Sequence, residues 1–334
     1  MCLRIANKTL VQLGMTAPNR DMHNLFDREL QREQELNSKD LRLFVQSNIT
    51  KMNIQQKHVY DRIMQAISNN AGGLYFLDAP GGTGKTFIIS LILATIPSEQ
   101  KVALALASSG IAATLLEGGR TAHSALKLPL NVQVIETPTC NISRNSAKAK
   151  VLRLTPIILW DECTMANKKL LEAFNRTMQD LRGNQQLFGG ALILLSGDFR
   201  QTLPRSTPAD EINACLKSSV LWKCVQKLTL NINMRIHLQK DPAAHEFSKQ
   251  LLQIGDGKIQ IDRTNGMITV PNNFCTITKS INELIECVFP NILQNYRNHD
   301  WLRERAILAP KNIHINAINF QIQAKLPGVV TTYI

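Results

Sequence analysis

Residues 79–86 combine glycines with a lysine and a threonine at a spacing that suits phosphate binding. The segment reads APGGTGKT and lies between a short apolar run and a longer one. Glycines let backbone N–H groups turn toward phosphate oxygens, and the start of the following helix adds partial positive charge. The segment therefore predicts a nucleotide-binding phosphate loop between a strand and a helix.

Two side chains of this loop have distinct expected roles. Lys85 reaches the β- and γ-phosphates of a nucleotide, and Thr86 ligates Mg²⁺. The residues expected to surround the phosphates are Gly81, Gly82, Thr83 and Gly84. Ala79 stands where the pattern GxxxxGK(S/T) has its first glycine, and because alanine is small we expect the loop still to form. The alternative is a glycine-rich turn with an accidental lysine.

An acidic pair follows the apolar run at residues 157–160. In phosphate-loop enzymes a strand next to the phosphate-loop strand ends in an acid that holds Mg²⁺, and a second group positions the attacking water. Asp161 fits the first role and Glu162 the second. Adjacent acids at a strand end also arise by chance, and the position of this pair downstream of the phosphate loop favours the functional interpretation.

A third apolar run ends in a polar cluster at residues 196–201. Ligands of open α/β sheets bind outside the carboxyl ends of the strands, so three such ends in one sheet would meet at one site. Gln201 is then placed to contact the γ-phosphate or the attacking water. Phe199 either stacks on a base or belongs to the core.

Short apolar runs that alternate with helical patterns are typical of a parallel α/β sheet. We expect a phosphate-loop domain of about five parallel strands with helices on both faces, preceded by a helical segment. The expected strands are 74–78, 102–107, 157–160 and 191–195, and the expected helices are 53–68, 86–95, 110–117, 244–254 and 280–293. A last strand–helix pair is expected over 306–325.

Composition limits the function classes. The 334 residues suggest about two domains, and 38 Lys+Arg against 26 Asp+Glu give a net charge of +12, which favours a polyanionic partner. The seven cysteines form no CxxC pair, which argues against a disulfide framework and a zinc site. The sequence begins without a signal-peptide pattern, and its apolar runs are too short to span a membrane.

Seven motifs occur in an order that resembles superfamily 1B helicases of the petite integration frequency (Pif) type. The helicase segment of Helitron-type transposon proteins is more similar still. The motifs are NIQQ at 53–56, APGGTGKT at 79–86, ASSGIAA at 107–113, GGRTAHS at 118–124, DECTM at 161–165, GDFRQTLP at 197–204 and NMR at 233–235. The first 50 residues and residues 307–312 also look like that family.

The resemblance implies a role for each matching residue. It implies that Gln56 reads the adenine edge, that Gln201 senses the γ-phosphate and that Arg235 is an arginine finger. Lys85, Thr86, Asp161 and Glu162 keep the roles given above. Without the family order, Arg235 is better explained as a surface salt bridge.

The resemblance also implies contacts with DNA, mostly electrostatic ones along the backbone of a single strand. Ser108, Ser109 and Gly110 would hold a phosphate, and His123 and Ser124 would make a second contact. A helix cap or a buried histidine is the structural alternative. The basic residues Arg144, Lys148, Lys150 and Arg153 either touch the strand or belong to a solvated loop.

The implied activity is that of an ATP- and Mg²⁺-dependent DNA helicase moving 5′ to 3′ on single-stranded DNA and acting at duplex junctions. Its implied setting is DNA repair, recombination or Helitron transposition, in the nucleus or in mitochondria, without a membrane. The implied domains are a helical segment over 1–50, a RecA-like domain over 51–236, and an incomplete second RecA-like half over 237–334. Oligomeric state is left open.

The second half that this family uses, with a further arginine and a glycine-rich motif, is not recognisable after Arg235, and a small deletion is indicated after Pro204. A truncated, non-catalytic remnant that binds nucleotide and DNA is therefore the alternative. A different phosphate-loop enzyme, such as an AAA-type remodeller or a kinase, is disfavoured by the GDFRQ and NMR motifs. A scaffold protein is disfavoured by the intact Lys85, Asp161 and Glu162.

Overall fold

The computed structural model of the chain describes residues 4–5, 8–9, 38–201, 207–239, 242–270, 274–309 and 311–328. The chain divides into two units, Met1–His245 and Glu246–Ile334, and each is described by itself. Strands β1 (Arg4–Ile5) and β2 (Lys8–Thr9) pair with each other in antiparallel fashion. The helix expected throughout residues 1–50 is therefore wrong at these four residues, because they form a hairpin.

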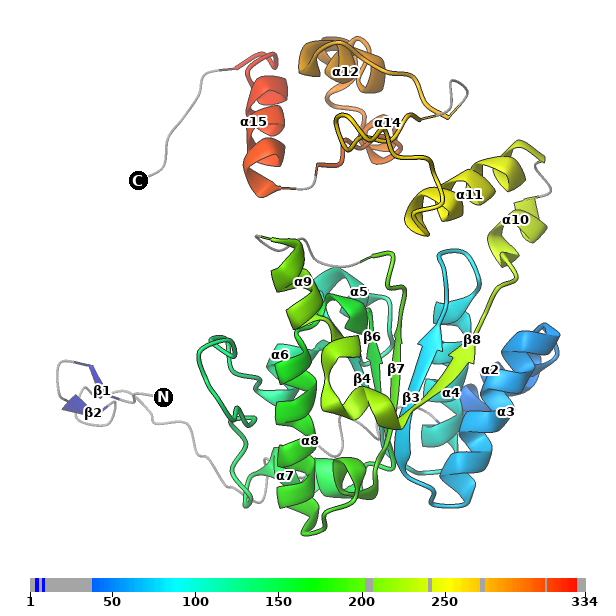
Figure 1. Ribbon diagram of the computed structural model, residues 1–334, viewed down its shortest axis with the longest axis vertical. Helices are drawn as coiled ribbons and strands as arrows, with labels where there is room; N and C mark the ends of the chain where they lie inside the picture. Colours follow the sequence, from blue (N-terminus) through cyan, green and yellow to red (C-terminus); the bar gives the residue numbers. More distant parts are fainter. Residues whose placement is uncertain are drawn as a thin grey trace. The chain divides into compact units, whose positions relative to one another are not determined.

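A six-stranded parallel sheet forms the centre of the first unit (Figure 1), which confirms the predicted fold class. Its order is β5 (Arg120–Thr121), β4 (Ala103–Ala107), β6 (Ile157–Asp161), β7 (Leu192–Gly197), β3 (Gly73–Asp78) and β8 (Val225–Thr229). The expectation that β6, the strand of the acidic pair, lies next to the phosphate-loop strand β3 is wrong, because β7 lies between the two. The sequence pattern also missed β5 and β8. The first has only two residues, and the second carries polar side chains because it is an edge strand.

Alternating side chains of each central strand point to opposite faces of the sheet, and each face has its own core. On β6, Ile157 and Leu159 belong to one core, and Ile158 and Trp160 to the other. Helices α2 (Ser38–Ile49), α3 (Ile54–Ser68) and α4 (Lys85–Ser98) cover the first face. Helices α6 (Ala122–Leu126), α7 (Ala147–Leu154) and α8 (Lys168–Arg182) cover the second (Figure 1).

Helix α2 packs into the phosphate-loop unit. Leu41 and Val45 are buried in the same core as the apolar side chains of α4. The guanidinium of Arg42 donates two hydrogen bonds of 3.2 Å to the carbonyl of Ser98 at the end of α4. The helix predicted within residues 1–50 is thus present over Ser38–Ile49, and residues 10–37 lie outside the described part of the chain.

Helix α4 is apolar on all sides because it lies between the sheet and helices α2 and α3. It has 14 residues, and the cation of Lys85 stands at its first position. None of the helices described in the structure has the length and apolar character that crossing a membrane requires.

The second unit is helical where it is described. After α11 (Pro242–Gly255), which spans the division between the units, come α12 (Ile281–Val288), α13 (Ile292–Asn295), α14 (His299–Arg303) and α15 (Asn312–Gln323). The single helix expected over 280–293 is wrong, since it breaks at Pro290 and at Asn291, whose φ is +53°.

The strand expected at the start of 306–325 is also wrong. Residues 305–309 are irregular, and the side chain of Leu308 is 93% exposed. Only the helix of this pair, α15, is present. An apolar run forms a strand only where another strand offers its hydrogen-bonding edge, and the described residues of this unit contain a single bridge, Ile261 to Ile268.

The basic residues of the loop before α7 contact α8. Arg144 forms a two-pronged pair with Asp180. Arg153 donates hydrogen bonds to the carbonyls of Leu181, at 2.9 Å, and Arg144, at 2.7 Å. Both arginines nevertheless lie in exposed positions, so the alternatives of a solvated loop and of a DNA contact both stay open for them. Lys148 donates to the carbonyl of Ser124 at 3.5 Å.

Arg182, at the end of α8, joins three elements through its guanidinium. It donates to the carbonyls of Leu152 at 3.0 Å, Gly189 at 3.5 Å, and Thr155. Burial lowers the pKa of Arg182, and these carbonyls supply the partners that a partly buried cation needs.

Replacing Arg182 with methionine is expected to lower the free energy of unfolding by about 2–3 kcal/mol, because three carbonyls lose a charged donor. Urea denaturation followed by circular dichroism measures this change. The matched control is Arg144→Ala, which removes an exposed ion pair on the same helix and should leave the denaturation midpoint nearly unchanged. Equal effects of the two variants would contradict the role given to Arg182.

Candidate active site

The phosphate loop joins β3 to α4, and its glycines are required by both backbone angle and space. Gly82 and Gly84 have φ values of +85° and +81°, which side chains rarely adopt. A Cβ atom on Gly82 would lie 2.5 Å from the Oδ1 atom of Asn233, and one on Gly84 would lie 2.4 Å from the Nε2 atom of Gln56. The loop is therefore packed against two other motifs of the chain.

Ala79 fits the start of this loop without the glycine of the usual pattern. Its side chain is buried, and its N–H donates to the carbonyl of Gly197 at 3.3 Å. Thr83 closes the turn, because its hydroxyl donates to the carbonyl of Pro80 at 2.8 Å. The expectation that alanine is tolerated at position 79 is confirmed.

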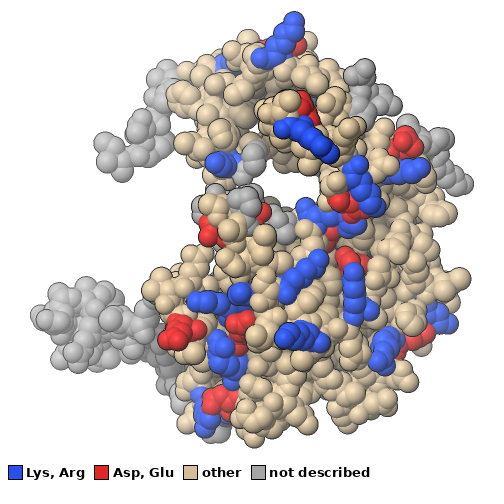
Figure 2. Space-filling model, in the orientation of Figure 1, with Lys and Arg blue, Asp and Glu red and all other residues tan. Residues whose placement is uncertain are grey.

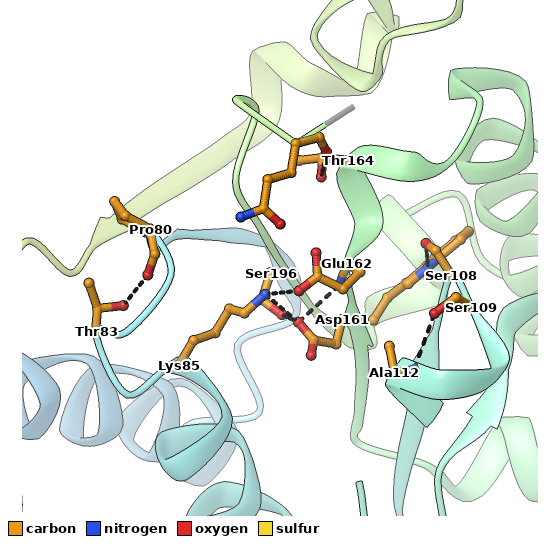
Figure 3. Close-up of polar contacts among 12 residues, drawn as sticks. Pro80, Thr83, Lys85, Ser108, Ser109, Ala112, Asp161, Glu162, Thr164 and Ser196 are labelled. Carbon is orange, nitrogen blue, oxygen red and sulfur yellow. Dashed lines mark hydrogen bonds and ion pairs between the residues drawn. The ribbon is translucent and has the colours of Figure 1, made fainter. Parts of the chain in front are cut away.

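Lys85 lies between the two predicted acids (Figure 3). Its Nζ atom is 3.0 Å from Oδ1 of Asp161 and 2.5 Å from Oε1 of Glu162. The same Asp161 oxygen accepts hydrogen bonds from the Ser196 hydroxyl, at 2.7 Å, and from the Glu162 N–H, at 2.9 Å. The ends of β6 and β7 and the start of α4 are thus joined by one network.

The positive charge of Lys85 in this network is balanced by the two carboxylates beside it. Burial by itself lowers the pKa of Lys85, but the carboxylates of Asp161 and Glu162 outweigh burial, and the pKa lies above its usual value. The lysine is therefore held as a cation. Its side chain is 13% exposed, whereas that of Glu162 is 24% exposed, so Glu162 is the more accessible of its two acidic partners.

The segment after β7, which carries Gln201, contacts the segment after the acidic pair through its main chain. The Thr164 hydroxyl donates to the carbonyl of Gln201 at 3.1 Å, while the Gln201 residue is exposed. A Cβ on Gly197 would lie 2.9 Å from the Cγ2 atom of Thr164, so the end of β7 passes close to this threonine. No role was predicted for Thr164 or Ser196 from the sequence. Both could have been predicted from their position at or just after the carboxyl end of an apolar run.

Gln56 has protein partners on both ends of its amide. Its Nε2 atom donates to the carbonyl of Thr83 at 3.1 Å, and its Oε1 atom accepts from the N–H of Asn53 at 3.0 Å. The residue is 2% exposed. Gln56 thus fastens the start of α3 to the phosphate loop, a contact that the resemblance did not imply and that competes with the implied recognition of adenine.

The neighbouring Gln55 holds a different segment. Its Oε1 atom accepts hydrogen bonds from the N–H groups of Asn231, at 2.9 Å, and Ile232, at 3.2 Å. This chain then continues to Arg235, whose N–H donates to the carbonyl of Gly82 at 3.1 Å. Arg235 is exposed, and its main chain lies against the phosphate loop.

The first expected DNA-contact segment follows β4, the neighbour of β6. The Ser108 hydroxyl accepts from the indole N–H of Trp160 at 3.0 Å, and the Ser108 N–H donates to the carbonyl of Asp161 at 3.1 Å. The Ser109 hydroxyl caps α5 (Gly110–Thr114) by accepting from the Ala112 N–H. Ser109 thus takes the structural role of a helix cap.

The second expected DNA-contact segment lies one strand further out. His123 and Ser124 are exposed on α6, which follows the edge strand β5. The cap of α6 is Thr121, whose hydroxyl accepts from the Ser124 N–H at 3.4 Å. The alternative of a buried histidine is therefore wrong for His123.

Phe199 belongs to an aromatic cluster. Its ring centroid is 5.1 Å from that of Phe76 and 5.3 Å from that of Trp222. The Nζ atom of Lys217 lies 4.1 Å from the centroid of the Phe199 ring. These contacts favour the core interpretation over base stacking.

The donor set fits a magnesium ion held jointly with a nucleotide. Thr86 is exposed in the first turn of α4, and Asp161 lies within the network of Lys85. Both supply oxygen atoms, which Mg²⁺ prefers, and such sites commonly use one or two protein ligands with phosphates and waters. The described residues contain no group of three His, Cys, Asp or Glu side chains suited to a metal.

Comparisons with known proteins agree with this geometry. A family model described as PIF1-like helicase matches residues 51–265. The ATP-dependent DNA helicase RRM3 of Saccharomyces cerevisiae is 28% identical over 54% of this chain and 24% of its own length. The ATP-dependent DNA helicase Pif1 of a Psychrobacter species is 30% identical over 77% of this chain and 36% of its own length. The chain thus spans about a third of these relatives, or less.

A solved structure shares the fold. It is the crystal structure of the Bacteroides Pif1 helicase in complex with ADP-AlF3 and single-stranded DNA. The match covers 82% of this chain and 58% of that one, with 18% identity and a TM-score of 0.51. At this identity the likeness supports the fold alone.

Replacing Gln56 with alanine is expected to weaken the binding of ATP and GTP equally, by about 3–10-fold, because the phosphate loop loses a hydrogen bond. Titration with fluorescent analogues of both nucleotides measures the two dissociation constants. Gln46→Ala, on the exposed side of α2, is the control and should match the wild type. A loss confined to ATP would show instead that Gln56 reads the base.

Proposed function

The chain belongs to the PIF1-like helicase family, and we propose that it is an ATP-dependent DNA helicase that couples hydrolysis to movement along single-stranded DNA. The observation that carries this proposal is the network of Lys85 with Asp161 and Glu162 beside the phosphate loop. A lysine for the phosphates and acids for metal and water are the parts that phosphoryl transfer to water requires. Movement from 5′ to 3′ belongs to the proposal through the resemblance alone.

We propose that nucleotide binding changes the partners of Lys85. The phosphates attract the same ammonium group that the two carboxylates hold, and its exchange to the β- and γ-phosphates releases Glu162. Glu162 then orients and polarises the attacking water. Gln201 contacts the γ-phosphate, and Arg235 stabilises negative charge on the transferring phosphoryl group.

Thr86 and Asp161 would hold Mg²⁺ at this site. Held by these two residues, the ion would supply positive charge that offsets the negative charge developing during transfer. The Ser196 hydroxyl supports Asp161 by donating to its Oδ1 atom at 2.7 Å. This second contact fixes the carboxylate that Lys85 leaves behind.

Single-stranded DNA and its junctions with duplex DNA are the proposed partners. The net charge of +12 favours a polyanion. Basic and acidic side chains are interspersed over the visible face of the first unit (Figure 2), so the DNA path is assigned from motifs and not from a continuous basic stripe. Ser108, Ser109, Gly110, His123 and Ser124 are the proposed contacts.

The process served is proposed as DNA repair, recombination or Helitron-type transposition, in the nucleus or in mitochondria. The names of the relatives support helicase activity in general. The alternative of a non-catalytic remnant would share the network of Lys85, Asp161 and Glu162, so ATP turnover is the property that separates the two.

Replacing Glu162 with glutamine is expected to lower ATP turnover by about 10²–10⁴-fold, because the water loses its base. ATP hydrolysis is measured on the purified chain with and without single-stranded DNA. The control is Glu99→Gln, the same change in an exposed ion pair away from the site. The proposal requires that DNA stimulate the turnover of the wild type and of this control.

Binding of ATP separates the outcomes of this experiment. Glu162→Gln is expected to keep ATP binding, whereas Lys85→Ala is expected to lose it while its thermal unfolding stays cooperative. If the wild type binds ATP but its turnover is no higher than that of Glu162→Gln, the proposal of an ATP-hydrolysing enzyme is contradicted. The non-catalytic remnant is then the supported alternative.

A further inference from the structure

Trp160 connects the strand of the acidic pair to the first proposed DNA-contact segment. Its side chain is 1% exposed on β6, and its indole N–H donates to the Ser108 hydroxyl at 3.0 Å. A buried indole N–H needs an acceptor, and here the acceptor is a side chain just beyond the end of β4. Trp160 therefore has a polar contact in addition to its packing.

This contact determines whether the Ser108 hydroxyl acts as donor or acceptor toward each partner. An indole N–H can only donate, so the Ser108 oxygen must accept from it. The single hydrogen of the hydroxyl is then left for a different acceptor. Donation by Trp160 also polarises the hydroxyl and makes it a better donor. A phosphate oxygen of a DNA backbone is an acceptor of the required kind.

The main chain adds a second connection between the same two strands. The ladder pairs Ala107 with Asp161, and the Ser108 N–H donates to the Asp161 carbonyl at 3.1 Å. Ser108 is thus bonded both to Trp160 and to the residue that carries the proposed magnesium carboxylate. The next residue, Glu162, is the proposed base, so a displacement of Ser108 reaches the acidic pair directly.

We propose that Trp160 is a positioning residue for the response to DNA: it sets the Ser108 hydroxyl to donate to a backbone phosphate and links that contact to Asp161. The inference rests on the proposed function, because it requires single-stranded DNA to bind at Ser108. It adds to that function a specific hydrogen bond through which DNA binding is sensed at the acidic pair.

A double-mutant cycle tests the bond. Trp160→Phe keeps an aromatic ring but removes the N–H, and Ser108→Ala removes the hydroxyl. Each is expected to weaken single-stranded DNA binding by about 3–10-fold, and to raise the DNA concentration for half-maximal stimulation equally. The double variant is expected to be no weaker than either single variant, since both changes break one bond. Fluorescence anisotropy at fixed salt measures the affinities.

Two further variants separate the bond from packing. Phe174→Leu removes a buried ring from the same core as Trp160 and leaves the Trp160 indole in place. It should lower the unfolding temperature without changing DNA affinity. Ser108→Thr keeps the hydroxyl and should keep DNA binding, which tests the need for this hydroxyl even if Trp160→Phe fails to fold.

The outcomes distinguish the inference from the proposed function. Additive losses in the double variant, wild-type affinity in Trp160→Phe, or an equal loss in Phe174→Leu would each overturn the role of Trp160 while leaving DNA binding intact. No binding of single-stranded DNA by the wild type would overturn the proposed function and the inference together. A non-additive cycle with Ser108→Thr near wild type supports the inference.

Discussion

The contact of one ammonium group with two carboxylates organises the first unit. Lys85 begins α4, the helix that follows β3 and the phosphate loop. Asp161 ends β6 and Glu162 follows it, and β6 is separated from β3 by β7. Their charges balance at short distance, which permits a lysine that is 13% exposed to stay charged. Because Lys85 follows β3 and the two acids follow β6, the pairing forms only once β3, β7 and β6 lie side by side in the sheet. The same charges are the ones that a nucleotide and its metal would rearrange.

A second constraint comes from the amino end of α3. Three polar side chains there contact separate parts of the site: Gln56 holds the phosphate loop, Gln55 holds the segment after β8, and the Asn53 amide nitrogen lies 3.1 Å from the sulfur of Met234. The segment that carries Arg235 is therefore bonded to α3, and the phosphate loop is bonded to the same helix. Any movement of Arg235 toward a nucleotide has to be made by its side chain or by breaking these contacts.

The connection between Ser108 and Trp160 shows how a binding surface can be tied to a catalytic edge without a large conformational element. In a parallel sheet, neighbouring strands end side by side, so Ser108, just beyond β4, is within hydrogen-bond distance of the last residues of β6. A donor-only indole on one strand and a hydroxyl on the next give that contact a direction. Packing of Trp160 in the core keeps the donor in place.

The sequence by itself determined the phosphate loop, the acidic pair and the alternation of apolar runs with helices. These features are local: glycine angles, strand ends and hydrophobic periodicity are properties of short segments. The sequence also predicted a small residue at position 79 to be tolerated, and the buried Ala79 agrees.

Only the tertiary structure decided which polar groups meet. It gave Arg144 and Arg153 partners on α8, gave Gln56 a partner in the phosphate loop, and left residues 306–309 without a strand partner. Each of these outcomes depends on a group far away along the chain. A residue type fixes what bonds a side chain can make, and only the fold supplies the partner.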